Sequence, residues 1–139
     1  MEEGENAKMK SILRKRRKKM IYIILVIVLI LGLNFLLNPL RWPANQIRNR
    51  LLNQTPIGTS MEDVIKVVEG NKKWEIENIR YDFGYTSLEP PFDEIGEKSI
   101  TVYLGEYWNP LVVDVTAWYG FDEEGKLIDV AVRKDVDTL

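Results

Sequence analysis

The feature that most constrains this chain is an uninterrupted apolar run, MIYIILVIVLILGLNFLL, at residues 20–37. It contains no charged residue, and fourteen of its eighteen residues are Ile, Leu, Val or Phe. A helix of this length rises roughly 27 Å, close to the ~30 Å hydrocarbon core of a bilayer. Those fourteen side chains favour membrane insertion by about 4 to 8 kcal/mol. The run therefore predicts a transmembrane helix, with anchor positions that include Met20, Ile21, Tyr22, Leu31 and Leu37.

Two other structures could contain such a run. A cleaved signal peptide has an apolar stretch of about 7–15 residues that ends in a small-x-small site. This run is longer, and residues 36–43, LLNPLRWP, contain no Ala-x-Ala pattern. A buried helix of a soluble protein is usually amphipathic, whereas this one is apolar on all sides. We therefore expect an uncleaved anchor, with Asn34 near the far interface or in a hydrogen bond between helices.

The residues before the anchor predict its orientation. Residues 1–19 contain eight basic and three acidic residues, and six of the basic ones directly precede the apolar run: Arg14, Lys15, Arg16, Arg17, Lys18 and Lys19. Positively charged flanks remain in the cytoplasm, and aromatic residues such as Tyr22 and Trp42 favour the two interfaces. The basic block could also bind anionic lipid head groups. The prediction is a single-pass protein of the cell membrane, with its C-terminal domain outside the cytoplasm.

The chain therefore divides into four parts. These are a basic cytoplasmic tail (1–19), the transmembrane helix (20–37), a juxtamembrane helix and linker (38–56), and an extracytoplasmic domain (57–139). Everything after the anchor carries eleven basic and eighteen acidic residues, a balance that disfavours nucleic acid as a partner. About a hundred residues can bury one modest hydrophobic core.

Two short helices are expected after the anchor. Pro43 can be the first residue of a helix that ends before the turn-forming residues 53–58. Ser60 is a good N-cap for a second helix, with acidic residues in its first turn and Gly70 at its end. In a shifted frame, Thr59 would be the cap in a capping box.

Four later segments alternate apolar and polar residues as strands do. They are 73–83, whose change of phase at Ile79 suggests a bulge, 100–105, 111–121, and a returning strand that contains Ile128, Val130 and Val132. Residues 84–98 read as a long acidic loop, and residues 121–127 as a hairpin turn with Gly125 at positive φ. The predicted class is α+β: the transmembrane helix, then one or two short helices packed on an antiparallel meander of about four strands.

Three of these segments resemble a known family. Gly58–Val64 has the Gly-x-Ser/Thr-x-x-x-Val helix start, Gly70 ends that helix, and Phe121–Leu127 has the hairpin pattern Phe-Asp-x-x-Gly-Lys-Leu. Residues 57–134 thus resemble the BamE-like (SmpA/OmlA) domain, part of a wider group shaped like β-lactamase inhibitor protein. The family's lipid-bearing cysteine is absent, and Thr59 stands where an apolar residue is common. The resemblance implies a small non-enzymatic domain of the cell envelope that binds other proteins.

The composition offers little for catalysis. The chain has no Cys and no His, which removes disulfides, most zinc sites and every Cys–His or Ser–His nucleophile. A Ser–Lys dyad would need Ser60 and Lys98, in a region similar to the nucleophile segment of type I signal peptidases, but Asp63 stands where that family has Pro. No Gly-rich phosphate loop or calcium-loop spacing is present. We expect no enzyme activity, no cofactor and no metal.

Aromatic residues of the strands are the better candidates for a function. Tyr103, Tyr107 and Trp118 are expected on the sheet face opposite the aliphatic residues, where they could contact another protein. The predicted function is a membrane-anchored extracytoplasmic interaction module with an unidentified protein partner. The alternatives are an anchored inhibitor, accessory or immunity protein that acts on a specific enzyme or toxin, and a structural subunit of a membrane complex.

Overall fold

The computed structural model describes residues 2–136. The first residue of the predicted tail and the last three of the predicted domain therefore lie outside the described residues. The chain forms two compact units, Met1–Asn38 and Pro39–Leu139. They are described separately.

The first unit is one helix, α1 (Glu2–Leu37), 36 residues long. It contains an 18-residue window with a mean hydropathy of 3.0, and it is long and apolar enough to cross a membrane; a signal sequence would meet the same criterion. The helix begins well before the predicted anchor because the tail is rich in Lys, Arg, Met and Glu, which are good helix formers. Asn34 donates its side-chain amide to the carbonyl of Ile30 over 2.8 Å, so a bond along its own helix satisfies one of its donors.

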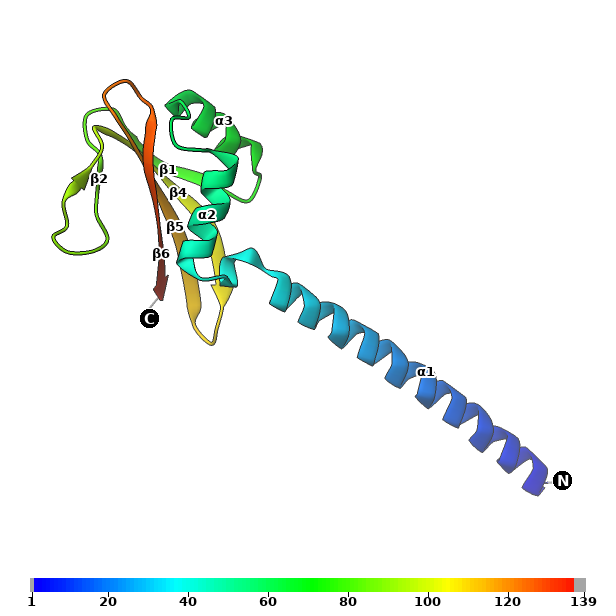
Figure 1. The fold of residues 1–139 in the computed structure, drawn as a ribbon. Helices are drawn as coiled ribbons and strands as arrows, with labels where there is room; N and C mark the ends of the chain where they lie inside the picture. The colour runs from blue at the N-terminus through cyan, green and yellow to red at the C-terminus, as the bar shows by residue number, and fades with distance from the viewer. Residues whose placement is uncertain (1, 137–139) are drawn as a thin grey trace. The chain divides into compact units, whose positions relative to one another are not determined.

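The second unit has the predicted α+β architecture (Figure 1). It starts with a 3-10 turn, η1 (Pro39–Arg41), and two helices, α2 (Ala44–Gln54) and α3 (Met61–Gly70). One antiparallel sheet follows, with strand order β1-β4-β5-β6. Its strands are β1 (Glu75–Arg80), β4 (Lys98–Trp108), β5 (Val112–Phe121) and β6 (Leu127–Val136).

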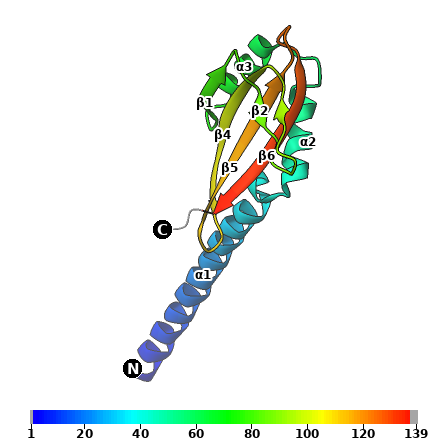
Figure 2. The same ribbon diagram turned by 90° about the vertical axis from the view of Figure 1, so that its left-hand side faces the viewer.

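Both short helices lie on one face of the sheet, which we call the inner face (Figures 1 and 2). The core forms where they meet it: Leu51 of α2 and Val64 and Val68 of α3 join strand residues such as Val115 and Tyr119, all 2% exposed or less. An 11-residue and a 10-residue helix are too short to be stable alone in water. Burial of these apolar side chains against the sheet is therefore what holds both helices in place.

The start of α3 agrees with the predicted cap at Ser60, whereas α2 starts one residue later than predicted. The hydroxyl of Ser60 accepts a hydrogen bond from the amide of Asp63 over 3.2 Å, whereas Thr59 donates its hydroxyl to the carbonyl of Pro56. Ser60 is thus the N-cap of α3, and the capping-box frame is wrong. Pro43, predicted as the first residue of α2, is instead its N-cap, with ψ at 146°.

Bulges decide which side chains face the core. The predicted bulge in β1 is confirmed, between Ile76 and Asn78. A second bulge lies between Tyr103 and Gly105 of β4, with Leu104 as the extra residue and φ of +126° at Gly105. Directly opposed residues share a face, and beyond this bulge Tyr107 is opposite Val113, whose side chain belongs to the inner face. The prediction that Tyr107 lies opposite the aliphatic residues is therefore wrong, because the extra residue reverses the phase of the strand.

A third irregularity lies at the start of β6. Phe121 pairs with Leu127 and Gly120 with Asp129, so Ile128 is the extra residue. As a result Leu127 is buried while Ile128 is 41% exposed. Alternation along the sequence predicts that Ile128, Val130 and Val132 share one face of the strand, but only Val130 and Val132 face the core.

The segment predicted as a long loop contains a small sheet of its own. Strands β2 (Tyr85–Thr86) and β3 (Glu94–Ile95) pair antiparallel. This segment lies over the face of the main sheet that is opposite the helices, which we call the outer face (Figure 2). The hydroxyl of Ser99 in β4 bonds to the carbonyls of Phe83 and Gly84, at 3.1 and 3.0 Å. These hydrogen bonds attach the segment to the sheet, and the segment forms a wall along the outer face.

Candidate binding groove

The outer face of the sheet holds Trp118 at the centre of a row. Trp118 on β5 is opposite Thr101 on β4 and Ala131 on β6, so all three side chains point outward. Tyr103 and Thr116 form the next row on the same face. Trp118 is half-buried rather than covered, because its two direct neighbours are small.

A groove of about 360 Å³ runs between this face and the β2 segment. Trp118 and Thr101 form its floor together with Asn78 of β1, and the segment from Phe83 to Leu88 forms its wall. The wall is close to the sheet because Gly120 has no side chain: a Cβ there would lie 2.9 Å from a ring atom of Tyr85. The groove therefore depends on the packing of the Tyr85 ring of β2 against Gly120 of β5.

The groove has basic side chains in its lining, although its domain is acidic. Arg80 and Arg133 line it, and no Asp or Glu is among the described residues that do so. The guanidinium of Arg133 lies 6.0 Å from the Trp118 ring, and that of Arg80 lies 5.6 Å from the Phe83 ring. Arg133 also donates from Nε to both carboxylate oxygens of Asp135, at 2.7 and 2.6 Å. Arginines held beside aromatic rings can bind a carboxylate by two parallel hydrogen bonds.

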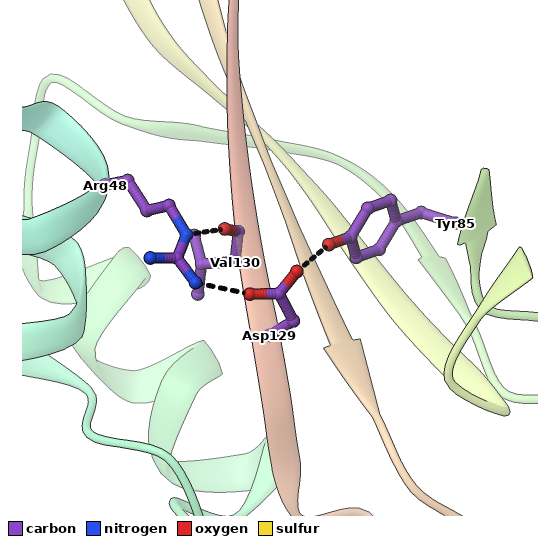
Figure 3. A network of polar contacts seen from close by, with 4 residues as sticks. All are labelled: Arg48, Tyr85, Asp129 and Val130. Atoms are coloured by element: carbon purple, nitrogen blue, oxygen red, sulfur yellow. Dashed lines mark hydrogen bonds and ion pairs between the residues drawn. The ribbon is translucent and has the colours of Figure 1, made fainter. Parts of the chain in front are cut away.

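A polar network holds the wall of the groove to the helix layer (Figure 3). Tyr85 donates its hydroxyl to one carboxylate oxygen of Asp129 at 2.7 Å, and Arg48 of α2 donates to the other at 2.6 Å. Arg48 also donates from Nε to the carbonyl of Val130 at 2.6 Å. The network therefore joins β2, β6 and α2 around the edge of the main sheet.

The same network shifts the pKa values of its members. Burial and the hydrogen bond to Asp129 raise the pKa of Tyr85 well above its usual range. Burial opposes ionisation of Asp129, but hydrogen bonds from Arg48, Tyr85 and the amide of Val130 outweigh it and lower its pKa. Asp129 is thus an ionised structural acceptor at neutral pH.

The three aromatic residues predicted as a contact surface do not lie together. Trp118 and Tyr103 share the outer face, but the Tyr103 hydroxyl bonds to Asp114 at 3.1 Å, and burial and this bond raise its pKa to about 12. Tyr107 packs on the inner side, with Arg41 and Lys134 each 5.0 Å from its ring centroid. Trp118 alone of the three lines the groove.

The predicted anchor and orientation residues all lie on α1. Met20, Ile21, Tyr22, Leu31 and Leu37 are exposed on this helix, as a lipid-facing surface would be. The block from Arg14 to Lys19 continues the same helix toward its N-terminal end.

The residues considered for catalysis have structural partners. The Ser60 hydroxyl caps α3, and the ammonium of Lys98 donates to the carbonyl of Glu123 at 2.9 Å. Among residues 2–136, no cluster of three or more His, Cys, Asp or Glu side chains is placed to hold a metal ion.

Sequence reasoning missed the two arginines of the groove and the network behind its wall. Arg133 could have been found, because the alternation of β6 places it on the same face as Ala131, beside Trp118. The network could not, because Arg48 and Asp129 are 81 positions apart and no local pattern joins them.

Comparison of the chain with family models, curated proteins and solved structures finds no match. The resemblance to the BamE-like domain therefore stays a prediction.

Proposed function

We propose that this protein is a membrane-anchored protein-interaction module without catalytic activity, whose domain lies outside the cytoplasm and binds its partner in the outer-face groove. The observation that carries the proposal is the groove itself: Trp118 on its floor, Arg80 and Arg133 beside it, and no acidic residue among its described lining.

The anchor part of the proposal rests on α1. Its apolar part has the length and composition of a membrane span, and the basic block before it favours a cytoplasmic N-terminus. The absence of Cys makes this orientation simple to test, because one introduced cysteine is the only thiol in the chain. In intact cells, a membrane-impermeant maleimide should label a Ser87→Cys variant and should not label Ser11→Cys. The reverse pattern would refute the orientation.

The partner part rests on the chemistry of the groove. Trp and Arg are the residue types that most often dominate the energy of protein interfaces. A volume of about 360 Å³ holds one or two side chains rather than a whole domain. We therefore propose that the partner presents a protein segment with an acidic side chain, which would lie between the arginines and against Trp118.

Site-specific photocrosslinking in intact membranes tests this proposal. A photoreactive residue at Thr86, on the groove wall, is compared with one at Glu69, which is exposed on α3. We expect a discrete crosslinked protein from position 86 only, and we expect it to disappear when Trp118→Ala is added. Phe92→Ala is the matched control, since Phe92 is an exposed aromatic residue outside the groove lining. Crosslinking from position 69 alone, or a product unaffected by Trp118→Ala, would place the contact elsewhere.

A further inference from the structure

We propose a second contact surface, separate from the groove. The turn between β4 and β5 inserts Trp108 and Leu111 into the interface of the bilayer that holds α1. This inference rests on the proposed membrane anchor but not on the groove or its partner. The occupant is the lipid head-group region, and the contact is apolar rather than electrostatic.

The turn exposes apolar side chains that do not contribute to the core. Trp108 is 67% exposed and Leu111 is 46% exposed. The amide of Asn109 bonds to the carbonyl of Leu111 at 2.8 Å, which keeps the turn tight and places Trp108 and Leu111 on either side of it. The preceding aromatic residue, Tyr107, is packed against the core, so the change from core to exposed surface occurs within one residue. Indole rings are enriched where protein meets the membrane interface.

The structure holds this turn close to the chain that leaves the membrane. The guanidinium of Arg41 donates to the carbonyl of Trp108 and lies over the ring of Tyr107. A Cβ at Gly105 would lie 3.1 Å from the side chain of Leu40, so the strand and η1 are in direct contact. In Figures 1 and 2, the β4–β5 turn lies at the same end of the sheet as η1.

Chain length then limits how far the turn can be from the bilayer. Arg41 follows Leu37, the last residue of α1, by four positions. Four residues span at most about 14 Å even when fully extended. This limit applies to any arrangement of the two units, because it depends on connectivity alone. When Leu37 lies at the interface, Arg41 and the turn bonded to it are within reach of the head groups.

The charges around the turn favour apolar insertion over an electrostatic contact with the head groups. Arg41 and Lys134 flank Tyr107 on the inner side, whereas Glu106 and Asp114 lie opposite each other on the outer face. Both signs are present beside the turn, so anionic lipid gains no clear advantage over zwitterionic lipid. The feature that distinguishes this end of the sheet is the exposed Trp108 and Leu111.

Quenching by brominated lipid tests the inference on the full chain. The protein is reconstituted into phosphatidylcholine vesicles whose acyl chains are brominated near the head group, and into unbrominated vesicles. A variant with Trp108 as its only tryptophan is compared with one whose only tryptophan is Phe92→Trp, on the exposed β2–β3 segment. We expect the emission of Trp108 to fall at least twofold in the brominated vesicles and that of the control to stay unchanged. Equal quenching of both variants, or of neither, would overturn the inference.

Two further arms keep the result clear. Trp74 packs against the core, so its removal can disturb folding. Trp42 is also exposed and lies close to the end of α1, so Trp42→Phe and the double variant Trp42→Phe, Trp108→Phe are compared as well. The added substitution at Trp108 should remove most of the quenching that the Trp42→Phe chain shows in brominated lipid. The measurement is repeated with about one third phosphatidylglycerol; quenching that occurs only with this anionic lipid would refute an apolar contact.

Flotation with the vesicles tests the anchor separately: a chain that does not float contradicts the anchor, and one that floats with Trp108 unquenched contradicts only this inference.

Discussion

Tyr85 and Asp129, 44 positions apart in the chain, share a hydrogen bond of 2.7 Å that crosses from the β2 segment to the edge strand of the main sheet. Tyr85 is only 4% exposed, and Arg48 holds the other oxygen of the same carboxylate. One carboxylate thus connects the outer wall of the groove with the helix on the inner face. The network is the part of the domain on which stability measurements will be most informative.

The first prediction concerns acid. The lowered pKa of Asp129 means that its ionised form stabilises the fold. This contribution is present above the unfolded-state pKa of about 3.9 and is lost as the pH falls through the lower folded-state pKa. We expect the free energy of unfolding of the wild-type chain to decrease more steeply between pH 5 and pH 3 than that of Asp129→Asn. Urea titrations in detergent micelles, followed by near-ultraviolet circular dichroism, would measure both; parallel curves would contradict the prediction.

The second prediction concerns the coupling between Arg48 and Asp129. Their side chains are 40% and 32% exposed, so water screens the pair in part, but Arg48 also bonds the Val130 carbonyl. A double-mutant cycle with Arg48→Met and Asp129→Asn should give a coupling of about 1 kcal/mol. The exposed pair of Lys66 and Asp63 on α3 is the control and should give a smaller coupling. A coupling at Arg48 no larger than at the control would show that the network is not cooperative.

The third prediction concerns the bulge in β4. Gly105→Ala forces a side chain into a backbone with φ at +126° and brings its Cβ to 3.1 Å from Leu40. We expect a loss of about 1–3 kcal/mol in the free energy of unfolding. Gly70→Ala is the control, because a Cβ there has no neighbour within 4 Å and φ is not positive; it should be neutral or slightly stabilising. Similar urea midpoints for the two variants would contradict the assigned geometry.

The fourth prediction concerns the N-cap of α3. Ser60→Ala removes the acceptor of the Asp63 amide and should cost about 1 kcal/mol. Ser60→Thr keeps a hydroxyl at the same position and should retain most of that stability. Thermal unfolding of the three proteins under one condition would compare them. If the Thr variant is as unstable as the Ala variant, the hydroxyl is not what stabilises the helix start.

Much of the fold could be predicted because its signals are local. Ser60 and the acidic first turn mark the start of α3, and strict alternation in β5 identifies which residues, from Val113 to Tyr119, face the core. That α1 is long and apolar enough to cross a membrane follows from a run of apolar residues alone. Each of these patterns lies within about a dozen residues, so one sequence is enough to read it.

The remainder depends on contacts between distant segments. A glycine inside a strand is a cue for a bulge, but only the register with β5 shows that Gly105 moves Tyr107 to the inner face. The groove needs the β2 segment to lie over Trp118, which is decided by Ser99, Gly120 and the network at Asp129. For this reason the position of Trp118 on the outer face could be predicted, whereas the groove around it could not.

The hydrogen bond from Arg48 to Val130 also affects whether two copies of the chain can pair through their edge strands. An edge strand such as β6 offers unpaired backbone groups that a second copy could extend into a continuous intermolecular sheet. Tethering would raise this risk, because it confines all copies to two dimensions in the same alignment. At Val130 the carbonyl accepts a hydrogen bond from Arg48, so a second strand could pair with that group only by displacing Arg48. Arg48, which supports the wall of the groove, therefore also opposes the pairing of a second strand at this point of the edge.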